Sequence, residues 1–214
     1  MADFKLLKPI LLGAPPTAVV GAADDGHAYV LTGSTGTVHI VDSKLNSVRS
    51  RRVSDELSEL RIMPHGKRVV AIASRSRELF ELDALSLNIV RRHKLDAPPI
   101  AIDVASTEYA AVSTGEHGVV ELFSVASGQH SRARFNGRIG AVRFRSDGAL
   151  LLVSNLHDRS LTALDVPNLQ VVADLPLAMQ PENLCFNSDG GQAFVSGTGC
   201  LLYTSDAADD LTRV

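Results

Sequence analysis

The sequence is poor in several residue types that particular functions require. Its 214 residues include no tryptophan and two cysteines, and aromatic residues make up 5% of the chain. Two cysteines cannot build a disulfide framework or, alone, a structural zinc site. Few aromatic rings leave little material for aromatic cages or stacking platforms. No apolar run approaches the ~18 residues of a membrane-spanning helix, so we expect no membrane partner.

Charge of one sign and catalytic motifs are also lacking. Lys and Arg number 21 and Asp and Glu 24, giving a net charge of −3. Without an overall positive field we expect no nucleic-acid partner. The chain has no phosphate-binding glycine loop, nucleophile elbow, H-E-x-x-H pattern or paired-cysteine site, so we predict no cofactor, no metal ion and no catalytic residue. Five histidines without a partner at ligand spacing are interpreted as surface or strand residues: His27, His39, His65, His93 and His130.

What the chain does contain is a repeat. Four segments share alternating apolar residues, then a short polar residue and a turn, and the intervals between the polar residues are each 41 residues: Asp42, Asp83, Ser124 and Asp165. A Ser-Asp-Gly turn at Ser146–Gly148 recurs 42 residues later at Ser188–Gly190. Asp-Gly pairs favour tight hairpin turns because both residues tolerate positive φ. A fixed period of this length indicates a repeat architecture.

Each repeat unit is predicted to contain four short strands separated by turns. The third unit places them at Pro99–Val104, Tyr109–Ser113, Val119–Phe123 and Gln129–Phe135, and the fourth at Ala141–Phe144, Ala149–Val153, Leu161–Leu164 and Gln170–Leu175. The only segment with a helical period, Glu56–Ile62, lies where a first strand is expected. Four strands in each unit of about 40 residues are typical of a β-propeller blade. A β-sandwich with fortuitous spacing is the alternative.

Several of these motifs resemble those of YVTN-type bacterial β-propellers, which are relatives by architecture of WD-repeat and lactonase-like propellers. They are the Ser-Asp-Gly turn, a second strand ending in Val153-Ser154-Asn155, and a Val-Asp pair before the next turn. Tyr29–Thr32 comes nearest to the namesake tetrapeptide, and the Gly-His and Trp-Asp signatures of WD repeats are absent. The resemblance covers residues 4–199 and implies the fold, but says almost nothing about function.

We therefore predict an all-β chain that forms an incomplete β-propeller of four-stranded antiparallel blades with a 41-residue repeat. The expected blades span residues 14–54, 55–96, 97–137 and 138–178, with part of a fifth at 179–199. Residues 4–13 share the register of a fourth strand, so we predict that they close the ring as an outer strand. No signal peptide is visible. A cytoplasmic location is the default expectation, and a periplasmic one follows if the start codon is misassigned.

The string from Cys200 to Asp210 differs in character from the repeats. It is similar to the peptide obtained by translating a transposase-based sequencing-library adapter. We interpret residues 200–214 as a non-native tail. The alternative is a natural strand over Leu201–Thr204, because Asp206 falls on the 41-residue grid.

Ligand-binding candidates come from the loop that joins the second and third strands of each unit. This loop should lie at one rim of the propeller, near the central channel, where polar groups that converge form binding sites. Equal offsets from the repeat position place a cation, an anion and imidazoles around this rim: Arg75, Glu116, His117, His157 and Asp158. A solvated rim that binds nothing is the competing interpretation.

Basic residues gather in the fourth strands of three consecutive units: Arg49, Arg51, Arg52, Arg91, Arg92, Lys94, Arg132 and Arg134. They could form a belt for an acidic partner. The favoured interpretation is that charges on outer strands discourage sheet-to-sheet aggregation.

Two functions from different classes follow. The first is a non-catalytic scaffold or binding module of YVTN type, with a protein or a small molecule bound at the channel rim. The alternative is a lactonase-like hydrolase, in which Arg75, Glu116 and His157 polarise and hydrolyse a cyclic ester.

Overall fold

The computed structural model describes residues 9–21, 27–42, 47–187, 189–198 and 200–206. Strands account for nearly all of its regular structure, in five antiparallel sheets. Sheet 1 contains β1 Ala18–Gly21, β2 His27–Thr32, β3 Thr37–Asp42 and β4 Ser47–Arg52. Sheet 2 contains β5 Glu59–Ile62, β6 Arg68–Ala73, β7 Glu78–Asp83 and β8 Ile89–Lys94. Sheet 3 contains β9 Ala101–Val104, β10 Tyr109–Ser113, β11 Val119–Ser124 and β12 His130–Arg134.

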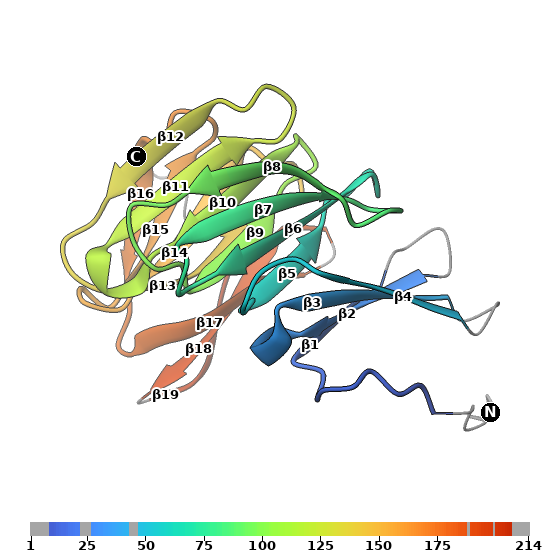
Figure 1. The fold of residues 1–214 in the computed structure, drawn as a ribbon. Helices are drawn as coiled ribbons and strands as arrows, with labels where there is room; N and C mark the ends of the chain where they lie inside the picture. The colour runs from blue at the N-terminus through green and yellow to red at the C-terminus, as the bar shows by residue number, and fades with distance from the viewer. Residues whose placement is uncertain (1–8, 22–26, 43–46, 188, 199, 207–214) are drawn as a thin grey trace.

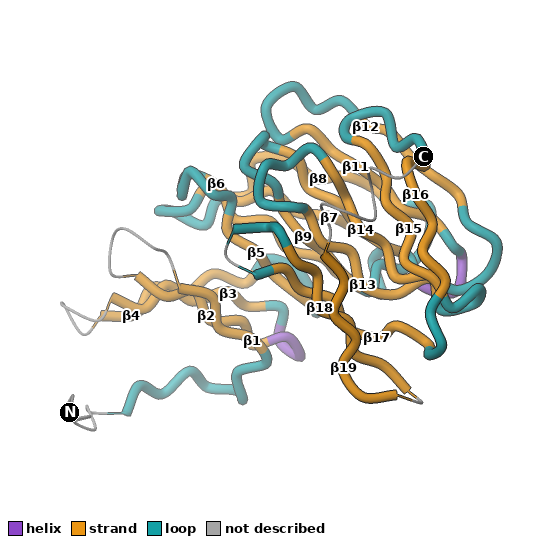
Figure 2. Tube along the Cα trace, turned by 180° about the vertical axis from the view of Figure 1, so that it is seen from behind, coloured by secondary structure: helices purple, strands orange, loops and turns teal. Residues whose placement is uncertain are grey.

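Sheet 4 contains β13 Ile139–Phe144, β14 Leu150–Asn155, β15 Ser160–Asp165 and β16 Val171–Pro176. Sheet 5 contains β17 Gln180–Phe186, β18 Gln192–Thr198 and β19 Cys200–Asp206. Within every sheet the strands are hydrogen-bonded in chain order. The first strands of successive sheets are neighbours: β1 lies beside β5, β5 beside β9, β9 beside β13 and β13 beside β17. The sheets follow one another in chain order, from blue to red in Figure 1 and seen from behind in Figure 2.

The repeated polar residue has the same place in four sheets, as predicted. Asp42, Asp83, Ser124 and Asp165 each end the third strand. In sheet 2, Oδ1 of Asp83 accepts hydrogen bonds from the backbone N–H and the hydroxyl of Ser86, at 2.9 and 2.8 Å. Ser124 and Asp165 cap the equivalent turns in sheets 3 and 4. Short side chains that bond nearby backbone groups stabilise such turns, which explains the period of the sequence.

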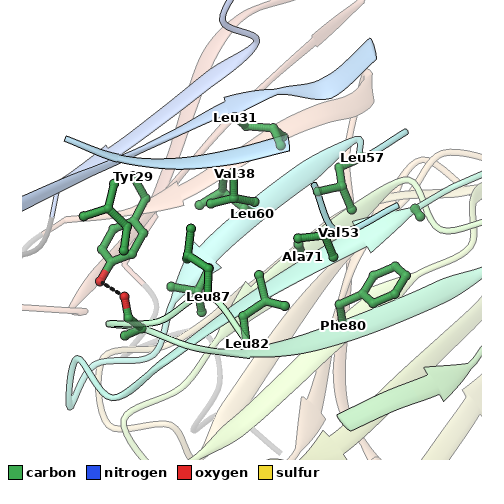
Figure 3. Close-up of a cluster of buried hydrophobic side chains, with 14 residues drawn as sticks. Tyr29, Leu31, Val38, Val53, Leu57, Leu60, Ala71, Phe80, Leu82 and Leu87 are labelled. Carbon is green, nitrogen blue, oxygen red and sulfur yellow. Dashed lines mark hydrogen bonds between the residues drawn. The ribbon is translucent and has the colours of Figure 1, made fainter. Parts of the chain in front are cut away.

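Apolar side chains fill the spaces between adjacent sheets because strand residues alternate between two faces. Figure 3 shows the cluster between sheets 1 and 2, where Tyr29, Val38, Phe80 and Leu82 are at most 1% exposed. The Tyr29 hydroxyl crosses this junction and donates to the carbonyl of Ala84 at 2.9 Å. Further clusters join sheets 2 and 3, 3 and 4, and 4 and 5. Each sheet therefore packs face to face on its neighbours.

The segment with a helical period forms the short strand β5, with Leu60 fully buried. Among the described residues, helical structure is confined to two 3-10 turns, Gly33–Thr35 and Gly115–His117. No helix in the described part of the chain is long and apolar enough to cross a membrane.

The sequence predicts an outer strand near the N-terminus and offers a strand near the C-terminus as an alternative. Residues 9–13 form no strand, and residues 4–8 lie outside the described residues. A closing strand would have to pair with a C-terminal sheet, and the N-terminal segment runs away from β17–β19 in both views. At the other end, β19 pairs with β18, with Asp206 opposite Gln192, so a strand is formed over Leu201–Thr204. The origin of residues 200–214 stays a prediction.

Candidate functional site

The loops between second and third strands lie beside the segments that enter the first strands. The backbone N–H of Leu57 donates to the carbonyl of Gly33 at 2.9 Å, and the N–H of His157 donates to the carbonyl of Arg138 at 3.0 Å. Exposed Arg75 makes a similar contact, because its N–H donates to Oε1 of Glu56 at 2.7 Å. These contacts gather the loops along one rim.

The five predicted rim residues do not form a single cluster. Glu116 pairs with Arg138 at 3.1 Å, with both side chains largely exposed. The ring of His157 packs against Gly137, where an added Cβ would lie 2.6 Å from its Cγ. His117 is exposed. Asp158 accepts a hydrogen bond from the Asn155 amide at 2.9 Å and lines a groove between sheets 3 and 4. Among the described residues, no hydrogen bond or ion pair joins any two of the five.

The first strands enclose a cavity of about 570 Å³, which is the channel of the fold. All five sheets, with the segments next to their first strands, supply its lining: Thr17, Ala18, Ser58, Glu59, Arg61, Ile100, Ala101, Arg138, Gly140, Ala141, Arg143, Leu156, Glu182 and Asn183. Arg138, at its edge, contacts two predicted rim residues, Glu116 through its side chain and His157 through its carbonyl. None of the five predicted rim residues lines the cavity itself. The channel is therefore the better candidate site.

Part of the charge in the channel wall is used to hold the sheets together. Arg61 pairs with Glu59 of its own strand, and its Nε lies 3.8 Å from Oδ1 of Asp103. Glu59 accepts a hydrogen bond from the N–H of Ile102 in sheet 3 at 3.0 Å, and Asp103 accepts one from the N–H of Phe144 in sheet 4 at 2.8 Å. These two carboxylates thus link three consecutive sheets.

Asp103 is the buried member of this network, with a side chain 16% exposed. Burial raises the pKa of its carboxyl group, because the charged form is poorly solvated there. The N–H of Phe144 and the guanidinium groups of Arg143 and Arg61 oppose this rise.

Arg143 lines the same cavity and is only partly buried. It donates to the carbonyl of Val142 at 2.8 Å. Within the described residues, no carboxylate lies within ion-pair distance of it. Ile100, 49% exposed, and Leu156 add apolar surface to the lining. The channel therefore offers a guanidinium group beside apolar side chains.

The sequence analysis missed this site, although a signal for it exists. Arg61 and Arg143 stand two repeat lengths apart, so they occupy the same position of the first strand in sheets 2 and 4. In the described part of the chain, no three His, Cys, Asp or Glu side chains are grouped so as to hold a metal ion.

Comparisons with known proteins establish the fold class. The chain is similar to the β-propeller domain of Cps50 (Swd1) from Myceliophteria thermophila, with 15% identity and a TM-score of 0.76, over 91% of this chain and 67% of that one. It is equally similar to a functionally unknown protein from Desulfotomaculum acetoxidans DSM 771, with 15% identity and a TM-score of 0.76, over 88% of this chain and 64% of that one. No protein-family model and no curated protein matches the sequence. The prediction of an all-β chain with propeller blades is confirmed.

Proposed function

We propose that the protein is a non-catalytic β-propeller binding module that holds a small organic anion in its channel. The observation that carries this proposal is Arg143, a cavity-lining guanidinium with no carboxylate of the described residues within ion-pair distance. A ligand carboxylate fits such a group because charge-assisted bonds to arginine are strong and directional. Ile100 and Leu156 would contact the apolar part of the ligand. The volume suits a small molecule rather than a protein segment.

The YVTN-type assignment belongs to the same proposal. Its support is the Ser-Asp-Gly turn at Ser146–Gly148 and the strand ending in Val153–Asn155, both at matching places in the blades. A protein ligand would meet the exposed rim loops that carry Arg75 and His117 instead of the channel.

The test is ligand-induced thermal stabilisation with a panel of small carboxylic acids, each paired with its uncharged amide. We expect acids to stabilise the protein and amides not to. Arg143→Gln should weaken binding by about tenfold or more, since a hydrogen bond to a charged group is worth about 1.5–3 kcal/mol. Arg145→Gln is the matched control, because Arg145 pairs with Asp147 at 2.6 Å and does not line the cavity. Equal responses to acids and amides, or equal effects of the two variants, would contradict the proposal.

The lactonase-like alternative has no comparable observation in its favour. It requires Arg75, Glu116 and His157 to act on one bound ester, and no contact joins them. Glu116 is instead paired with Arg138.

A further inference from the structure

The outer ends of sheets 1 and 2 present cations toward each other. In sheet 1, Arg49 and Arg51 lie opposite Ile40 and Val38 in the strand register. Residues directly opposite each other on antiparallel strands point to the same face. Ile40 and Val38 belong to the core between sheets 1 and 2. Arg49 and Arg51 therefore point toward sheet 2.

The same reasoning applies to β8 of sheet 2. Arg92 lies opposite Phe80, and Lys94 lies opposite Glu78. Phe80 belongs to the core shared with sheet 1, so Arg92 and Lys94 point toward sheet 1. The Arg92 guanidinium lies 5.5 Å from the centre of the Phe80 ring. A groove of about 400 Å³ opens between the two sheets, and of the four cations only Arg92 lines it. Its other charged lining residues are Arg52, Asp55 and Glu78.

These four cations lack neutralising partners in the protein. Within the described residues, no carboxylate lies within ion-pair distance of Arg49, Arg51, Arg92 or Lys94. Arg51 reaches across the junction to the side-chain oxygen of Asn88 at 2.6 Å, and Lys94 donates to the carbonyl of Ser76 at 2.5 Å. The neighbouring Arg52 is paired with Asp55 at 2.8 Å. Neutral oxygen atoms thus take the places where carboxylates would be expected.

Charges on outer strands discourage sheet-to-sheet aggregation. In addition, these four side chains face one another across the space between two sheets. Like charges that face each other repel. A groove built in this way gains stability when an anion enters it.

We propose that an acidic polypeptide segment binds at the junction of sheets 1 and 2, across the outer strands β4 and β8, through Arg49, Arg51, Arg92 and Lys94. Each cation comes from an outer strand, where the segment can lie extended along exposed backbone. Nucleic acid fits less well because the aromatic ring at this junction, Phe80, is 1% exposed and cannot stack on a base. This site is separate from the channel and does not depend on the ligand proposed there.

The test is fluorescence anisotropy with a labelled, Glu-rich peptide of about ten residues, a length that spans about 33 Å when extended. We expect binding that weakens as salt rises, because exposed charge pairs are screened. Arg51→Glu combined with Arg92→Glu should weaken binding by about tenfold or more, since like charges replace attractive pairs.

The chain contains a matched control. Arg132→Glu with Arg134→Glu makes the same charge change in sheet 3, where Asp96 already pairs with both arginines. We expect this control to change the affinity by less than about twofold, because the four cations at the junction of sheets 1 and 2 are unchanged. Because Arg92 packs on Phe80, Arg51→Glu alone serves as a second variant that leaves that contact intact. Circular dichroism melts would verify folding of all variants.

Three results would overturn the proposal. Wild-type protein could fail to bind the peptide at low salt, or both double variants could weaken binding equally. A poly-dT oligonucleotide could bind more tightly than the peptide and depend on the same arginines, which would assign the groove to nucleic acid. Arg143→Gln should leave peptide binding unchanged, so failure of this proposal and failure of the channel proposal are distinguishable.

Discussion

At the junction of sheets 2 and 3, Glu81 and Glu121 have side chains only 1% exposed and lie beside histidine and arginine side chains. Oε1 of Glu81 lies 2.5 Å from Nε2 of His93 and 3.4 Å from Nη1 of Arg91. Glu121 lies 2.9 Å from His130, and its other oxygen accepts the N–H of Asp96 at 3.2 Å. The outer ends of sheets 1 and 2 have the same strands in the same places, but their facing cations have no such buried acids.

The two junctions also differ in how their aromatic rings are packed. Phe123 lies between His93 and His130, with ring centres 4.6 and 4.5 Å apart, which fills the outer part of the second junction. At the first junction, Phe80 contacts only the Arg92 guanidinium among described rings and cations, and the groove stays open. The basic residues of the outer strands therefore have different surroundings at the two junctions. Arg91 pairs with buried Glu81 between sheets 2 and 3, whereas the cations that face each other between sheets 1 and 2 meet no buried acid of the described residues.

The largest expected effect comes from removing a buried acid of the second junction. Glu81→Ala should lower the free energy of unfolding by about 3 kcal/mol or more, because it removes the buried partner of Arg91 and of the His93 ring nitrogen. Glu78→Ala at the first junction, where no ion pair is formed, should change it by about 0.5 kcal/mol or less. Urea unfolding measures both. Equal losses would break the distinction between the two junctions.

The loops above the two junctions are expected to respond in opposite directions. Gly36 has φ of +59°, and an added Cβ would lie 2.2 Å from the carbonyl oxygen of Ser54. Gly36→Ala should therefore cost about 2–3 kcal/mol. Arg77 has the equivalent place in sheet 2 with φ of 54°. Arg77→Gly relieves the left-handed strain of a side chain and should change stability by about 1 kcal/mol or less, in the stabilising direction. A destabilised Arg77→Gly, measured by thermal unfolding, would show that its side chain matters more than its backbone.

A smaller effect is expected in the pH dependence of the free energy of unfolding, which should differ between Asp103 beside the channel and Asp147 at the surface. Burial raises the pKa of Asp103 above its ordinary value of 3.8, so the folded state holds this proton more tightly than the unfolded state. Its contribution to stability is greatest below the unfolded pKa and falls as pH rises through the folded pKa. Asp103→Asn should therefore gain stability relative to wild type as pH rises above 3.8, by about 1.4 kcal/mol for each unit of pKa difference.

Asp147 provides the opposite sign. Hydrogen bonds from Arg145 lower the pKa of this carboxyl group, so its contribution is present above the unfolded pKa and is lost as pH falls through the folded pKa. Asp147→Asn should lose stability relative to wild type at neutral pH. Urea unfolding at several pH values measures both variants, and a parallel pH dependence for the two would contradict the assignment of Asp103 as the buried group.

The sequence alone determined the blades, because the interactions that define them are local. Asp83, Ser124 and Asp165 bond backbone groups within five residues of themselves, and alternation along a strand is enough to predict its buried face. The predicted strands of the third and fourth units therefore begin and end within two residues of those in sheets 3 and 4. The predicted rim residues were also identified from this period, because they have the same offset from the repeat position. An equal offset does not bring their side chains together at one binding site.

Only the tertiary structure decided where the charges point and what they meet. Adjacent residues of a strand point to opposite faces, so Arg91 meets Glu81 on one face of sheet 2 and Arg92 meets Phe80 on the other. Which sheet covers each face is decided by the tertiary structure. The pairing of Glu116 with Arg138 and the entry of Arg143 into the channel likewise depend on how one sheet is placed against the next. A period of 41 residues specifies where each strand lies but not which side chains face each other across a junction.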